Sequence, residues 1–241
     1  MSEVITKTKT VSRGKSLLLF ILTNIGGFVL FIFPNLLLGI SKWNGGLSGI
    51  NLLFMALFQF FSVCTLIYFS LKIMGKDFRF IGLSSNYWKV DSVLGLLTGL
   101  SWTALQVLWI IPSTGGSERN DIAQILETMD GTALGLISYI ALGVIGGGIT
   151  EEIFNRGYFI NVLKSTFKNQ QFGLWIAAIL SILFFAAGHL PSNTIEWFDI
   201  LPPTLAYTLL FIYTRRLTAS IVAHAVYNAT AILSVYYLYY Q

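Results

Sequence analysis

The stretch TALGLISYIALGVIGGGITEEIFNRGYF, residues 132–159, is uncharged and apolar over 132–150 and then carries Glu151, Glu152 and Arg156. An apolar run of this length forms a helix that can cross about 30 Å of hydrocarbon. A charged side chain near the middle of such a helix costs roughly 2.5–3.5 kcal/mol on insertion scales. The stretch therefore predicts a membrane-spanning helix whose three charged residues have a function.

The rest of the chain has the same character. Of its 241 residues 55% are hydrophobic and 11% are charged, and the mean hydropathy is +0.71. Each apolar run must be helical, because lipid offers no other partner for backbone N–H and C=O groups. We expect an all-α, polytopic bundle of seven or eight transmembrane helices with a polar cavity open to the cytoplasm. Besides 132–150, the expected spans lie near 17–40, 50–74, 92–111, 172–190 and 217–240, with a short seventh at 200–213.

The domain organisation follows from these runs. We expect residues 1–16 to form a cytoplasmic N-terminal tail and residues 17–241 a single transmembrane domain, with the catalytic helices within about 132–240. The first apolar run is too long for a signal peptide and lacks a cleavage site, so it is expected to be retained. Cys64 is the only cysteine, which rules out an internal disulfide.

The loop charges predict the orientation and the environment. Basic residues gather in alternate short loops, and the positive-inside rule then places the N-terminus in the cytoplasm and the 112–131 loop outside. This pattern accounts for the net charge of +4 without nucleic acid, which we exclude as a partner. We expect a multi-pass protein of the cell (plasma) membrane, with membrane lipids as its surroundings.

The charged residues of the opening stretch divide into a pair and a free group. Glu152 and Arg156 are four residues apart with the acid first, the favourable order for an ion pair on a helix. Glu151 points about 100° away from Glu152, and its own position four residues on is Asn155, which cannot neutralise it. Gly143 and Gly147 have the spacing that lets a neighbouring helix approach these carboxylates closely.

Two histidines lie in later apolar segments. His189 follows Phe185 by four residues, and Asn228 follows His224 by four, so His224 and Asn228 share a helix face. A lone buried histidine is usually a satisfied core residue. Here a carboxylate, two imidazoles and a carboxamide could converge in one cavity, which is the default functional reading for polar groups inside a membrane.

These three motifs, EExxxR at 151–156, FxxxH at 185–189 and HxxxN at 224–228, resemble the signatures of the CAAX protease and bacteriocin-processing (CPBP, or Abi) family of intramembrane proteases. The resemblance covers residues 145–230. It implies that Glu151 and His189 hold and deprotonate a water that attacks a peptide carbonyl. It further implies that His224 and Asn228 stabilise the oxyanion, and that Glu152, Arg156 and Phe185 support the site.

Other interpretations stay open. Two histidines and a glutamate also form a zinc ligand set, although HExxH is absent and Asn228 is a poor ligand, so no cofactor is expected. A proton-coupled transporter is disfavoured because the sequence offers no continuous relay of ionisable groups across the membrane. A non-enzymatic immunity protein that binds a bacteriocin or its receptor is the main alternative. As substrate we expect a peptide or protein at the bilayer, with a bacterial peptide precursor or a bacteriocin-related peptide favoured over a prenylated CAAX protein.

Overall fold

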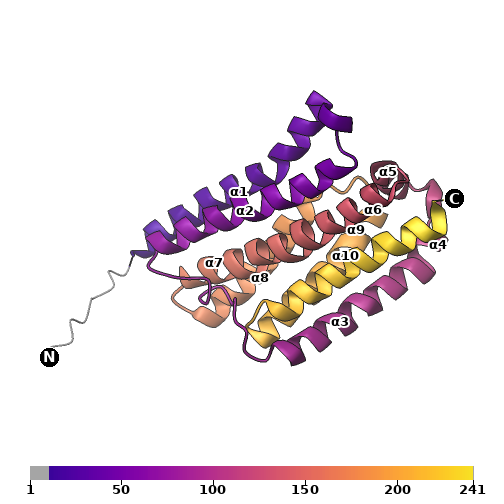
Figure 1. The fold of residues 1–241 in the computed structure, drawn as a ribbon. Helices are drawn as coiled ribbons and strands as arrows, with labels where there is room; N and C mark the ends of the chain where they lie inside the picture. Colours follow the sequence, from indigo (N-terminus) through magenta and orange to yellow (C-terminus); the bar gives the residue numbers. More distant parts are fainter. Residues whose placement is uncertain (1–10, 241) are drawn as a thin grey trace, which may run out of the picture.

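A computed structural model describes residues 11–240 and contains only helices, turns and loops within that range. Adjoining elements combine into seven helices that are long and apolar enough to cross a membrane. The all-α fold with seven spans is thereby confirmed (Figure 1). The elements are α1 (Arg13–Ser41), η1 (Trp43–Gly45), α2 (Ile50–Ile73), α3 (Trp88–Leu105), η2 (Gln106–Ile110), α4 (Ile111–Ser113), η3 (Gly116–Glu118), α5 (Asn120–Met129), α6 (Ala133–Ala141), η4 (Leu142–Glu151), η5 (Ile153–Ile160), α7 (Asn161–Ser165), α8 (Gln170–Gly188), α9 (Thr194–Thr214) and α10 (Thr218–Tyr239).

Three boundaries differ from the sequence prediction. Helix α1 begins at Arg13, inside the expected tail, because the side chain of Ser12 caps it; residues 1–10 of that tail lie outside the described range. The apolar run expected at 132–150 belongs to a helix that continues to Ser165, so the charged residues lie within it, as expected. The short segment expected at 200–213 begins at Thr194, after the cap Asn193, and no eighth span occurs in residues 11–240.

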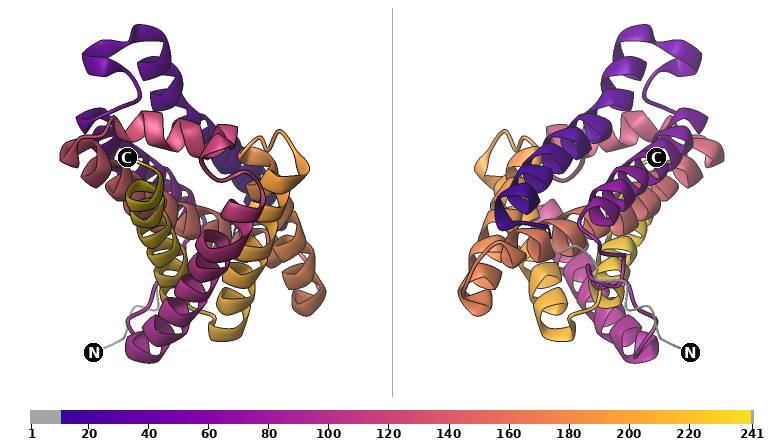
Figure 2. Two further views of the ribbon diagram at one scale, coloured as in Figure 1. Left: turned by 90° about the vertical axis from the view of Figure 1, so that its right-hand side faces the viewer. Right: turned by 90° about the vertical axis from the view of Figure 1, so that its left-hand side faces the viewer.

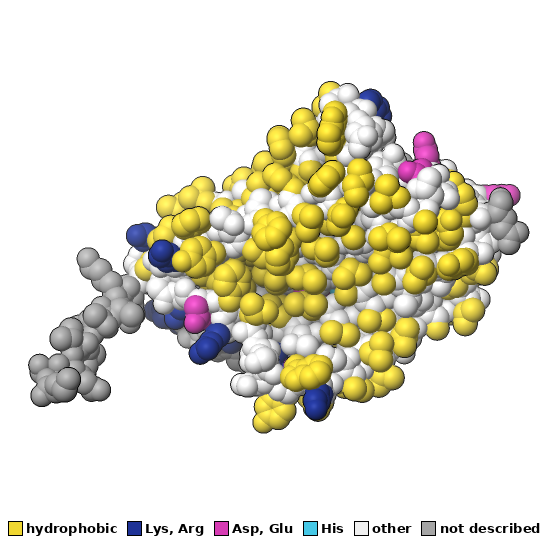
Figure 3. Space-filling model, in the orientation of Figure 1, with side chains coloured by type: hydrophobic (Ala, Val, Ile, Leu, Met, Phe, Trp, Pro, Cys, Tyr) yellow, Lys and Arg dark blue, Asp and Glu magenta, His cyan; other side chains and the backbone are white. Residues whose placement is uncertain are grey.

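The two ends of the bundle carry opposite charges. We call the end with the loops 74–87, 166–169 and 215–217 the basic end, and the end with the loops 42–49, 114–132 and 189–193 the acidic end. Apolar side chains cover the surface between them, with lysine and arginine mainly toward the N-terminus and acidic side chains mainly at the opposite end (Figure 3). This distribution is typical of a membrane protein whose two ends face water.

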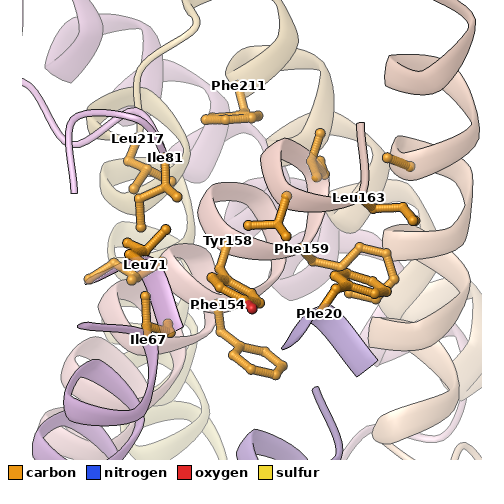
Figure 4. Close-up of a cluster of buried hydrophobic side chains, with 14 of the residues drawn as sticks. Phe20, Ile67, Leu71, Ile81, Phe154, Tyr158, Phe159, Leu163, Phe211 and Leu217 are labelled. Atoms are coloured by element: carbon orange, nitrogen blue, oxygen red, sulfur yellow. The ribbon is translucent and has the colours of Figure 1, made fainter. Parts of the chain in front are cut away.

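The main hydrophobic core fills the bundle toward the basic end. Phe154 and Tyr158 stand at its centre, with Phe20 of α1, Leu71 of α2 and Phe211 of α9 around them (Figure 4). All five are at most 8% exposed. The bundle is therefore closed by packed side chains at this end.

Small residues bring α10 against two neighbours, and Figure 1 shows it running beside α3. A Cβ atom on Gly95 or Gly99 of α3 would lie 2.5 Å from a backbone oxygen of α10. On the other side, a Cβ atom on Gly148 of η4 would lie 2.6 Å from the Cα of Ala225. At these glycines no side chain would fit between α10 and its neighbours. Helix α10, which carries two candidate residues, therefore packs closely against both α3 and η4.

Helix α5 lies across the acidic end and does not span the bundle (Figure 2, left). It buries Ile122 and Met129 against a second core cluster that includes Ile232 and Val235 of α10. Gly115 and Gly131, on either side of α5, both have positive φ, which lets the chain turn into and out of the helix.

Candidate functional site

A cavity of about 460 Å³ opens from the acidic end and reaches into the centre of the bundle. Its volume is within the range of roughly 300–1,000 Å³ found for ligand sites. Five of the seven candidate residues contribute to its wall, and none of its lining residues comes from the loops of the basic end. The five are Glu151, Phe185, His189, His224 and Asn228.

Behind the wall lies the expected ion pair of Glu152 and Arg156. Arg156 Nη1 is 2.9 Å from Glu152 Oε1, and both side chains are fully buried. The guanidinium carbon of Arg156 also lies 4.4 Å from the ring centre of Phe185. Because each charge neutralises the other, the pair can remain in a site without water contact.

The buried pair fixes the orientation of His224. Nδ1 of His224 is 2.9 Å from Glu152 Oε1, and the imidazole stacks on Tyr207 with ring centres 4.9 Å apart. A carboxylate accepts hydrogen bonds, so Nδ1 carries the proton in this contact. Nε2 is consequently the nitrogen that remains free to bind a group in the cavity.

Glu151 is the carboxylate that faces the cavity. Its side chain is 23% exposed, and its Oε2 lies 4.0 Å from Nε2 of His224. Asn155 donates to the backbone oxygen of Glu151 and not to its carboxylate. An atom about 3 Å from both Oε2 and Nε2 would contact both groups, which is the geometry required of a reacting atom.

His189 does not contact the Glu151 carboxylate directly, and the expectation that these two residues hold one water stays a prediction. Among residues 11–240, His224 is the only charged or imidazole partner within 4.0 Å of the Glu151 carboxylate. His189 lies at the exposed C-terminal end of α8, where its Nδ1 is 2.9 Å from the backbone oxygen of Phe185 and its ring is 4.5 Å from the Phe185 ring. The motif spacing places His189 in the cavity wall, but α8 ends there and leaves the imidazole near the opening.

Asn228 is positioned by η4. Its Nδ2 donates to the backbone oxygen of Gly143 at 2.8 Å, which leaves a second N–H for the cavity. A Cβ atom on Gly147 would lie 2.5 Å from Asn228 Nδ2 and 3.6 Å from His224 Nε2. The two glycines therefore admit both polar side chains beside Glu151, as their spacing predicts.

The helix that carries the glutamates is not an α-helix at this point. From Leu142 to Glu151 and from Ile153 to Ile160 its backbone bonds have π-helical spacing, and Thr150 donates its hydroxyl to the oxygen of Ile145, five residues earlier. π-Helical turns are rare and frequently occur at functional sites. The sequence shows no signal for this change of spacing other than its run of glycines.

The arrangement does not fit a zinc ion. Among residues 11–240, no three His, Cys, Asp or Glu side chains lie close enough to share a metal. The zinc ligand set considered from the sequence is not assembled in this conformation.

Sequence reasoning missed one polar group at the opening. Arg119, which precedes α5, is only 8% exposed and bonds to Asp121 and Asp199. Gln106 of η2 also donates to Asp199, at 2.9 Å. These four residues come from three separate segments, so no sequence spacing connects them.

The position of the cavity also bears on the orientation in the membrane. The cavity opens at the acidic end, whereas the N-terminal helix starts at the basic end (Figure 1). A cytoplasmic N-terminus and a cavity open to the cytoplasm, both expected from the sequence, therefore exclude one another.

Comparison with known families supports the assignment from the motifs. Residues 133–230 match the family model described as type II CAAX prenyl endopeptidase Rce1-like. Comparisons with the curated proteins and with the solved structures gave no significant match. Over residues 133–230, which carry all seven candidate residues, the chain therefore matches the CAAX prenyl endopeptidase family, and the resemblance drawn from its motifs is confirmed.

Proposed function

We propose that this protein is an intramembrane glutamate protease that hydrolyses a peptide bond of a membrane-associated peptide or protein. The observation that carries the proposal is the Glu151 carboxylate, which faces the cavity 4.0 Å from a histidine whose other nitrogen is held by a buried ion pair. The match to the CAAX prenyl endopeptidase family favours protease activity of this kind.

The proposed reaction begins with a water between Glu151 and His224. Glu151 accepts one proton of the water as the water oxygen attacks the carbonyl carbon of the substrate. The carbonyl oxygen becomes an oxyanion, to which Asn228 can donate its free N–H. When the C–N bond breaks, the proton passes to the leaving amine, and a carboxylic acid and an amine are released.

The histidines have different parts in this scheme. Glu152 holds the proton of His224 on Nδ1, so Nε2 can accept a hydrogen bond from the water in the neutral ring. Nε2 can donate to the oxyanion only as the doubly protonated imidazolium. We propose that His189, which lines the cavity near its opening, contacts the peptide or a second water.

We further propose a role in bacteriocin self-immunity or peptide maturation at the plasma membrane. If the basic end is cytoplasmic, as the positive-inside rule predicts, the cavity opens on the outer side. An exported peptide would then meet the active site where it contacts the membrane.

The activity can be tested by mass spectrometry of new peptide termini. Purified protein in detergent is incubated with membrane and secreted peptides of its host, with and without a zinc chelator. We expect new termini that survive chelation, because the proposed base is a carboxylate. Loss of cleavage on chelation would contradict the glutamate mechanism in favour of zinc, and an absence of new termini would favour the immunity protein that only binds.

The orientation can be tested with single cysteines. In a Cys64→Ala background, Ser117→Cys marks the acidic end and Lys168→Cys marks the basic end; both positions are exposed. We expect an impermeant maleimide to label Ser117→Cys in intact cells and Lys168→Cys only after lysis. The reverse pattern would place the cavity toward the cytoplasm and the N-terminus outside.

A further inference from the structure

The polar group at the cavity opening has a defined geometry. Arg119 donates from Nε to Asp121 Oδ1 at 3.0 Å and from Nη2 to Asp121 Oδ2 at 2.6 Å, and it also contacts Asp199. Gln106 donates from Nε2 to Asp199 Oδ1 at 2.9 Å. All four side chains line the same cavity as Glu151.

The charges within this group do not balance. Burial alone would lower the pKa of Arg119, but its hydrogen bonds and charge contacts with Asp121 and Asp199 outweigh burial and raise the pKa, so the guanidinium stays protonated. Two carboxylates against one guanidinium leave a net charge of −1. Each carboxylate has about four acceptor positions and uses two of them here, so both can accept further donors.

Gln106 supplies a second and independent observation. It is only 2% exposed, it lines the cavity, and its Oε1 has no hydrogen-bond partner within residues 11–240. A buried acceptor without a donor costs about 1–3 kcal/mol. This oxygen and the free acceptor positions of Asp121 and Asp199 can all accept hydrogen bonds from a ligand that carries N–H groups.

The surroundings strengthen the preference for a cation. The loops and helix ends of the acidic end carry more acids than bases, whereas the basic loops are at the far end of the bundle. A cleft lined by one sign of charge between low-dielectric walls concentrates ligands of the opposite sign. Besides the opening group, the acidic end carries Glu118, Glu127, Asp130 and Glu196, with Lys42 as its further base.

We propose that the opening group of Gln106, Arg119, Asp121 and Asp199 binds a positively charged side chain, lysine or arginine, of the peptide that enters the cavity. The ammonium or guanidinium donates to the free acceptor positions of Asp121 and Asp199 and to Gln106 Oε1. The proposal rests on the proposed function, because the ligand is taken to be the peptide that Glu151 hydrolyses. The opening group then selects peptides by their charge, while Glu151 and His224 cleave them.

The test uses a set of quenched fluorescent peptides. One apolar parent sequence carries lysine, its uncharged isostere norleucine, or glutamate at each position in turn, and kcat/KM is measured for the full-length protein in detergent. At one or two positions we expect lysine to be preferred over norleucine by about tenfold or more, because the ion is bound by charged acceptors in a partly buried site. The preference should fall as salt is raised.

Two variants assign the preference to the opening group. Asp199→Asn keeps the side-chain shape and should reduce the lysine preference to less than about threefold. Asp121→Asn, at a more exposed side chain, should have the same direction of effect if Asp199→Asn does not fold. Glu127→Gln is the matched control, because Glu127 is acidic and exposed on the same helix but does not line the cavity.

A binding measurement separates failure of this proposal from failure of the proposed function. Fluorescence anisotropy of labelled lysine and norleucine peptides is compared on the Glu151→Gln variant, where cleavage is not needed. Charge-selective binding without cleavage by the wild type would support the opening group and contradict the protease. Cleavage with equal rates for lysine and norleucine at all positions, or equal selectivity in Asp199→Asn and the wild type, would overturn the charge proposal alone.

Discussion

Glu151→Gln is expected to lower the rate of peptide cleavage by about 10²- to 10⁴-fold, the usual contribution of a general base. Glutamine has the shape of glutamate but cannot take the proton of the attacking water. Since Glu151 is partly exposed to the cavity and has no cation within 4.0 Å among residues 11–240 other than His224, its folding role is small. The thermal unfolding temperature should therefore stay close to that of the wild type. The measurement is the initial rate on a peptide identified from the new termini.

The control for this variant is Glu118→Gln, the same substitution at an exposed position of the acidic end. It should leave the rate unchanged. Full activity of Glu151→Gln would exclude the mechanism proposed here. An unchanged immunity phenotype of Glu151→Gln in cells would identify the protein as one that protects by binding.

Arg156→Met is expected to be the most damaging single change to stability, at about 3–5 kcal/mol, because it leaves a buried carboxylate without its cation. Glu152 is completely buried, so no water can replace the guanidinium. Arg156 also donates to the backbone oxygen of Thr204 at 3.4 Å and covers the ring of Phe185, so α9 and α8 lose contacts as well. The free energy of unfolding in mixed micelles is the quantity to measure.

A double variant distinguishes the charge from the packing. Glu152→Gln with Arg156→Met removes both charges and should recover much of the lost stability, since no uncompensated charge is then buried. The double variant should nevertheless be inactive, because His224 Nδ1 no longer faces a carboxylate. Arg79→Met, the same change at an exposed arginine, is the control. Wild-type stability in Arg156→Met would contradict this account of the pair.

The sequence was sufficient for the features that depend on composition and on spacing along one helix. Apolar runs predict the spans because lipid enforces helical hydrogen bonding. The four-residue spacing predicts the pair of Glu152 and Arg156 because the side chains of one helix must share a face. The same argument predicts that His224 and Asn228 point into one cavity.

Features that depend on how separate segments meet were not accessible in this way. The imidazole within 4.0 Å of the Glu151 carboxylate is that of His224, whereas His189 lies at the end of α8, near the opening. The group around Arg119 joins residues that lie up to 93 positions apart, between Gln106 and Asp199. Such contacts depend on how whole helices pack together, and local sequence patterns do not predict that packing.

The π-helical stretch from Leu142 to Ile160 has a consequence for changes of chain length. Each π turn accommodates one residue more than an α turn, so the register of Gly143 and Gly147 relative to Glu151 depends on the exact number of residues between them. Removing a single residue there without a change in winding would rotate one part of the site by roughly 100° relative to the other. We therefore expect this helix to tolerate no insertion or deletion between Gly143 and Glu151, whichever residue is added or lost.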